Sequence, residues 1–248
     1  MKKLISLFAV FAISAVTAFA NVEISHNLSI SPIGAYAIQM QDDTSIDGYY
    51  LKIGDFKAEN EFNFFFGSPL FMDIGLNLRT GLGVFTCDGF EYDGDTETDS
   101  TFGISYSMAM GPSVRFNINN RHSFIASCDI GGYMCTNSIL LDDDDIEHNM
   151  WGITVEDQIG YRFWIVNKTG FHFGLACNAN YSIPVYGSYS NFKSETETPG
   201  YSADFDVTGG SVFTVSFGLV FNFGDRGYDK NYGNKSADTV SENTEVTE

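Results

Sequence analysis

The stretch SVFTVSFGLVFNF, residues 211–223, most constrains what this chain can form. From Phe213 onward large apolar residues alternate with small or polar ones, and only Val220 breaks the pattern. Period two indicates a β-strand, because successive side chains of a strand point to opposite faces. One face would carry four phenylalanines, and the other mainly Ser, Thr, Gly and Asn. A strand between lipid and a wet lumen needs both faces, so the stretch predicts a membrane-spanning strand.

Seven earlier segments repeat this alternation, which predicts eight strands in total. Three of the connections between them are short and rich in turn residues, and the other four are long and acidic. The predicted fold is therefore all-β, an eight-stranded antiparallel up-and-down transmembrane β-barrel with four long acidic external loops and short periplasmic turns. Its strands are expected at 26–40, 50–66, 71–86, 102–118, 123–135, 150–165, 171–185 and 211–223.

Aromatic residues on the apolar faces gather at both ends of these strands, as in the interfacial girdles of membrane proteins. Beside the short turns they are Phe64, Phe66, Phe116, Phe124, Tyr161, Phe163, Phe171, Phe173, Phe221 and Phe223. Toward the long loops they are Tyr36, Phe102, Tyr106, Trp151, Tyr181 and Phe213. This placement supports the barrel independently of the strand count.

The two ends of the chain differ from the barrel region. Residues 1–20 hold two lysines, an apolar core and the sequence Ala-Phe-Ala, which predicts a secretory signal peptide cleaved before Asn21. No later run approaches the roughly 18 apolar residues of a membrane helix, so a second membrane could be entered only as a closed barrel. The barrel would span 21–223, and the polar residues 224–248 predict a disordered tail. An even strand number places both termini in the periplasm and the loops outside.

These features resemble the small eight-stranded outer-membrane barrels of the OmpA and OmpX kind, a superfamily that includes opacity-type surface proteins. The resemblance implies a bacterial outer membrane, contact with its lipid, and insertion by the barrel-assembly machinery. Such barrels usually end on an aromatic residue that this machinery reads, whereas 25 residues follow Phe223 here. The resemblance implies an internal assembly signal formed by Phe217, Leu219, Phe221 and Phe223. The tail is too short for the peptidoglycan-binding domain of larger relatives.

Charged residues of the strands have lumen parity, with Asp157, Asp55 and Lys52 as the exceptions. This arrangement disfavours a soluble lipocalin-like barrel, whose charges would face outward. If Phe66 pairs with Met72, Glu59 lies directly opposite Arg79. The favoured interpretation is a structural network of ion pairs, because an unpaired buried charge is costly; a gate or narrow ion path is the alternative. The candidates are Lys57, Glu59, Glu61, Asp73, Arg79, Arg115, Asp129, Glu156 and Arg162.

The acidic loops carry much of the formal charge of −19, which excludes a nucleic-acid-binding protein. Their simplest role is to keep the surface solvated. Cations or a basic surface partner are the alternatives. The carboxylates at 93, 95, 97 and 99 alternate like calcium ligands, but Thr98 and Ile104 stand where an EF-hand needs Gly and Glu.

The four cysteines divide into two pairs. Cys128 and Cys177 have lipid-face parity and are interpreted as small apolar residues. Cys87 and Cys135 fall at the loop end with inward parity, and an oxidising location would permit a disulfide between them. Because another strand lies between the two strands that carry these cysteines, the loops would have to move for a disulfide to form.

The sequence predicts a protein with a structural or surface-interaction role that displays acidic loops. The alternative is a narrow cation-preferring channel, and a lipid-modifying barrel enzyme is a remote one. The histidines at 26, 122, 148 and 172 form no Ser-His-carboxylate group and no pair with metal spacing, so no catalytic residue, metal site or cofactor is expected.

Overall fold

The computed structural model describes residues 21–42, 45–66, 72–92, 95–96, 100–136, 146–168, 170–193, 201–224 and 226. The predicted signal peptide and all of the predicted tail except Gly224 and Arg226 lie outside these ranges. Within them no helix has the length and apolar character needed to cross a membrane.

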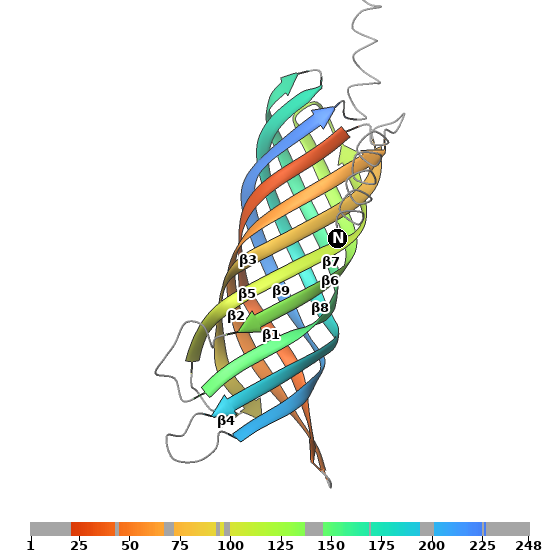
Figure 1. Ribbon diagram of the computed structural model, residues 1–248. Coiled ribbons are helices and arrows are strands. Elements are labelled where there is room, and N and C mark those ends of the chain that lie inside the picture. Colours follow the sequence, from red (N-terminus) through yellow and green to blue (C-terminus); the bar gives the residue numbers. More distant parts are fainter. Residues whose placement is uncertain are drawn as a thin grey trace, which may run out of the picture.

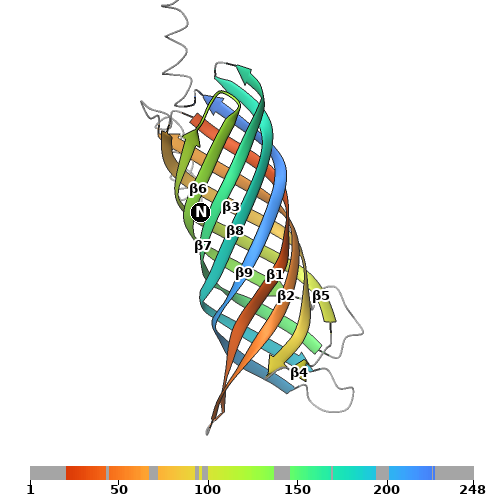
Figure 2. The ribbon, with the colours of Figure 1, turned by 180° about the vertical axis from the view of Figure 1, so that it is seen from behind.

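Eight long strands form one closed antiparallel barrel (Figures 1 and 2). Each strand pairs with its neighbours in the chain, and β1 pairs with β9 to close the circle. The short β4, Asp95–Thr96, pairs antiparallel with Glu91 and Tyr92 at the end of β3. The long strands are β1 Asn21–Asp42, β2 Ser45–Phe66, β3 Met72–Tyr92, β5 Ser100–Asn117, β6 His122–Thr136, β7 Ile146–Lys168, β8 Phe171–Lys193 and β9 Tyr201–Gly224. The predicted eight-stranded up-and-down barrel is thus confirmed.

The barrel has two ends. At the turn end lie the β2–β3, β5–β6 and β7–β8 connections, together with Asn21 and Gly224. The last of these turns uses Gly170 at φ 77°, a conformation that other residues rarely adopt, and its carbonyl accepts the Gly224 amide at 2.9 Å. The opposite end, called the loop end here, joins β1 to β2, β3 to β5, β6 to β7 and β8 to β9.

The outer wall is apolar and the inner wall is polar except toward the loop end, largely the reverse of a soluble barrel. Leu82, Ile130 and Ile159 expose 61%, 68% and 66% of their surface, while Glu61 and Arg162 are fully buried. A continuous exposed apolar belt of this kind fits a hydrocarbon surround. Near the turn end its rings pack in cross-strand pairs, such as Phe173 with Phe221 at 5.1 Å between centroids.

The strands extend further toward the loop end than the apolar alternation predicts. β8 runs to Lys193 and β9 begins at Tyr201, so much of the loop expected at 187–207 is ladder. The loop expected at 41–48 is likewise a hairpin, since β1 ends at Asp42 and β2 begins at Ser45. Backbone hydrogen bonds can continue beyond an apolar belt because they do not depend on side-chain polarity. The acidic residues Asp93, Glu97 and Asp99 and the run at 142–145 lie outside the described residues.

A bulge in β1 overturns the predicted orientation of Tyr36. The pairing shifts between Ser31 and Ala35 toward β2, and between Ile30 and Ile33 toward β9. An extra residue reverses the side-chain alternation beyond it. Tyr36 therefore points inward and is only 5% exposed, rather than joining the outer girdle.

Candidate functional site in the lumen

The strand register places all nine predicted lumen charges on the inner wall and corrects one expected pair. Phe66 pairs with Ile74 rather than Met72, so Glu59 lies opposite Gly81, and Glu61 lies opposite Arg79. A shift of two residues leaves every side chain on the same face, so the predicted inward orientation of these charges holds although the predicted pairing was wrong. Most of the long side chains then find partners across the lumen, whereas Arg115 also binds Asp73 directly opposite it on the adjacent strand.

Near the turn end, Arg162 on β7 joins two carboxylates from the opposite wall. Its Nε donates to Glu23 at 2.7 Å, and its Nη2 donates to both oxygens of Glu61 at 3.1 Å. Asn178 accepts from Nη1. Both ion pairs are fully buried, so their hydrogen bonds must replace all of the water that these charges lose.

Arg115 on β5 lies in the same layer and shares Glu23. It donates to Glu23 at 2.9 Å and to Asp73 at 2.9 and 3.1 Å. The amide oxygens of Asn21 and Asn222 accept from it at 3.0 and 2.6 Å, and its guanidinium lies 4.2 Å from the ring centre of Phe65. The two arginines and their three carboxylates, hereafter the arginine layer, close the lumen cross-section with side chains.

Between the arginine layer and the turn end, Trp164 and Arg226 obstruct the lumen. Trp164 is fully buried and donates from Nε1 to Ser123 at 2.6 Å. Arg226 places its guanidinium 5.1 Å from the Trp164 ring and donates to the Asn120 carbonyl at 2.7 Å. Arg226 belongs to the predicted tail, so this residue is bound to the barrel where disorder was expected.

Replacing Arg226 with alanine should lower the free energy of unfolding by about 1 kcal/mol, because a desolvated cation–π contact and its hydrogen bonds are lost. Urea unfolding of refolded protein measures this change. In a Trp151→Phe background, Trp164 emission should also shift. Arg121→Ala, at an exposed arginine of the same end, is the control. A midpoint and an emission equal to those of the parent would contradict the contact.

On the loop-end side of the arginine layer, Arg79 on β3 reaches across to β6 and β7. It forms an ion pair with Glu156, donates to Gln158 at 2.8 Å and lies 3.6 Å from Asp129. Glu156 also accepts from Thr154 at 2.8 Å. Arg79 therefore spans the lumen at mid-height.

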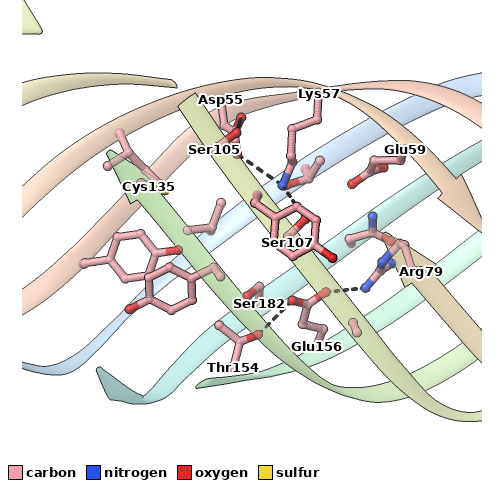
Figure 3. A pocket seen from close by; sticks show the side chains of 18 residues that line it. Asp55, Lys57, Glu59, Arg79, Ser105, Ser107, Cys135, Thr154, Glu156 and Ser182 are labelled. Atoms are coloured by element: carbon pink, nitrogen blue, oxygen red, sulfur yellow. Dashed lines mark hydrogen bonds and ion pairs between the residues drawn. The ribbon is translucent and has the colours of Figure 1, made fainter. Parts of the chain in front are cut away.

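A cavity of about 40 Å³ lies next to Arg79 (Figure 3). Lys57 projects into it, held by Asp55 at 3.2 Å and by Ser107 at 3.5 Å. Glu59 lies beside these two cations, yet its Oε2 has no hydrogen-bond partner among the described residues. This volume is large enough for a few water molecules.

Toward the loop end the lumen is filled by apolar side chains. Tyr36 and Tyr133 stack with ring centres 4.9 Å apart. Their cluster also contains Ile38, Leu51, Ile53, Phe85, Cys135, Met150, Tyr189, Val207 and Val212. From the turn end to the loop end, the lumen thus consists of a polar ion-pair region, a small polar cavity and an apolar plug.

The cysteine bridge expected between Cys87 and Cys135 is not formed. Cys135 is a buried free thiol, and the side chain of Cys87 lies outside the described residues. On the intervening β5, Cys87 pairs with Thr101 and Cys135 with Ser105. Four residues of strand amount to about 13 Å along the sheet. This offset, added to the two strand spacings, far exceeds the Cα separation of a disulfide.

The described histidines have polar or aromatic neighbours rather than catalytic ones. His26 lies 2.6 Å from Asn60, His122 contacts Tyr161, and His172 contacts Asn167. His148 has no described side chain. Groups of three or more metal-binding side chains do not occur within the described ranges.

The sequence did not reveal three charged groups of this site. Glu23 lies before the first predicted strand, Asp55 was assigned outward, and Arg226 was assigned to the tail. Asp55 has the same parity as Lys57, which would have placed it correctly. Extending the first strand back to Asn21 by its alternation would have included Glu23.

Comparison with known proteins reveals the fold but no closer relationship. No protein-family model and no curated protein sequence matches the chain. The outer membrane protein OprG from Pseudomonas aeruginosa superposes with a TM-score of 0.57 at 11% identity, over 84% of this chain and 98% of OprG. The outer membrane protease OmpT from Escherichia coli gives a TM-score of 0.45 at 9% identity, over 82% and 97% of the two chains. The architecture is that of a bacterial outer-membrane barrel.

Proposed function

We propose that this outer-membrane barrel protein is a closed scaffold whose role is exerted at the cell surface. The arginine layer carries this proposal, since Arg115, Arg162, Glu23, Glu61 and Asp73 are all fully buried and leave no open path. Small eight-stranded barrels enclose little more than side chains, which agrees with a filled lumen. The acidic loop-end segments then supply the surface that meets the environment, a basic partner or cations.

The proposed orientation sets the turn end and both termini in the periplasm and the loop end outside. It is supported by the short turns, which membrane barrels place on the periplasmic side. Within this orientation, outward-facing Phe217, Leu219 and Phe223 on β9 remain candidates for the assembly signal, together with Phe221. The protein is proposed to lack enzymatic activity.

A narrow cation-preferring channel is the second candidate. The cavity beside Arg79 favours it, because a polar space at mid-height would be one stage of an ion path. Conduction would require the arginine layer and the Tyr36–Tyr133 stack to rearrange.

Planar-bilayer recording separates the two proposals. Refolded protein with confirmed heat-modifiable migration should give no discrete conductance steps. A variant with Arg115→Ser, Glu23→Ser and Asp73→Ser removes three of the five members of the arginine layer, and if it folds it should still be silent, because Trp164 and the Tyr36–Tyr133 stack continue to obstruct the lumen. Discrete cation-selective steps from the unmodified protein would overturn the closed scaffold and favour the channel.

Surface binding tests the other half of the proposal. A fluorescent oligolysine peptide should bind cells that display the protein, and neutralising the aspartates at 142–145 to asparagine should weaken binding. Neutralising Asp157, which lies on the outer wall of β7, serves as the matched control and should have no effect. Equal binding by all three proteins would contradict an electrostatic surface role.

A further inference from the structure

The cavity on the loop-end side of the arginine layer combines an excess of negative charge with oxygen atoms that lack hydrogen-bond partners. Three carboxylates line it, Asp55, Glu59 and Glu156, but only two cations, Lys57 and Arg79. Asp129, which shares Arg79, adds further negative charge. If all of these groups are ionised, the side chains around the cavity therefore carry a net charge of at least −1.

Glu59 is the carboxylate of this lining that no described ion pair includes. Lys57 is paired with Asp55, and Arg79 with Glu156 and Asp129, whereas the described ion pairs do not include Glu59. Glu59 is 5% exposed, and its Oε2 has no protein hydrogen-bond partner in the described part of the chain. Burying a carboxylate oxygen without a hydrogen-bond partner costs roughly a few kcal/mol unless the group is neutralised or the oxygen gains a partner.

A second orphan oxygen belongs to the same cavity. Asn180 on β8 is also 5% exposed, and its Oδ1 lacks a hydrogen-bond partner within the described residues. The hydroxyls of Ser107, Ser182 and Thr214 complete a lining rich in oxygen. Carboxylate, amide and hydroxyl oxygens are ligands for hard cations.

We propose that this cavity binds one monovalent alkali cation, sodium or potassium, with Glu59 and Asn180 as its principal protein ligands. A single positive charge would neutralise Glu59 without disturbing the Lys57 and Arg79 pairs. A divalent ion would exceed this requirement, and the described residues form no cluster of three acidic, cysteine or histidine ligands. The available volume accommodates the ion with one or two waters.

The ion should stabilise the folded barrel, because a ligand that binds only the native state raises its stability with concentration. Unfolding midpoints of the refolded protein in detergent are compared in sodium chloride, potassium chloride and N-methylglucamine chloride at equal ionic strength. The midpoint should be higher in at least one alkali salt and should saturate as the salt replaces N-methylglucamine. Sodium NMR linewidths should broaden with the folded protein if sodium is the ion.

Glu59→Gln keeps the shape of the side chain and should abolish the difference between salts. Asp157→Asn makes the same chemical change on the outer wall and should retain it. If Glu59→Gln does not fold, Asn180→Ala provides the comparison. Identical midpoints of the unmodified protein in all three salts would show a neutral carboxyl with water only and overturn the proposal. A salt difference that persists in the folded variant, or a stronger effect of magnesium, would also overturn it.

Discussion

Replacement of Arg162 by methionine is expected to lower the free energy of unfolding by about 3–5 kcal/mol, the usual cost of removing one partner of a buried ion pair. Glu23 and Glu61 would each lose a charged donor at 2.7 to 3.1 Å, with no water to replace it. Urea unfolding of refolded protein in the Trp151→Phe background, followed by the emission of buried Trp164, measures the change.

Two controls separate loss of the pair from loss of charge in general. Lys168→Met removes a cation exposed at the same end of β7 and should leave the midpoint nearly unchanged. Arg162→Met combined with Glu61→Gln should recover part of the loss, because one orphaned charge disappears. An Arg162→Met midpoint equal to that of Lys168→Met would contradict the structural role of the arginine layer.

Replacement of Gly218 by alanine should destabilise the barrel by about 2–3 kcal/mol through overpacking. A Cβ at this position would stand 1.9 Å from the His26 carbonyl oxygen and 2.6 Å from the Asn27 Cα. These are backbone atoms of β1, so the strands themselves would have to separate at the closing seam.

Gly209→Ala on the same strand is the matched control. A Cβ there meets only the Ala37 side chain, at 3.7 Å, which is ordinary van der Waals contact. Its unfolding midpoint should equal or slightly exceed that of the parent, because alanine restricts the unfolded chain. Equal midpoints for the two variants would contradict the close approach of β9 to β1.

Strand number and side-chain orientation could be predicted from the sequence because lipid imposes a strict alternation on every strand. Phe217 and Leu219 face outward and Arg115 and Arg162 face inward, as their parity indicates. The polar alternation beyond the apolar belt gives no such signal, so strand ends near Lys193 and Tyr201 were missed. The β1 bulge was also missed, although Pro32 and Gly34 are residues typical of irregular strands.

Ion-pair partners were less predictable than faces. Arg79 was expected beside Glu59, but it binds Glu156, which is 77 positions away in the sequence. Parity states which wall a side chain occupies, whereas its partner depends on the stagger and tilt of all strands around the barrel. Neither quantity is encoded in any single segment. The unmatched carboxylate of Glu59 could therefore be recognised only from the structure.

The contacts of Arg115 connect three distant parts of the chain at one point. From β5 it reaches Glu23 and Asn21 at the beginning of β1 and Asn222 at the end of β9, the two strands that meet last in chain order. A chain that has not yet delivered its last strand cannot satisfy this guanidinium. Arg115 therefore has its full set of hydrogen bonds only when the first and last strands have joined.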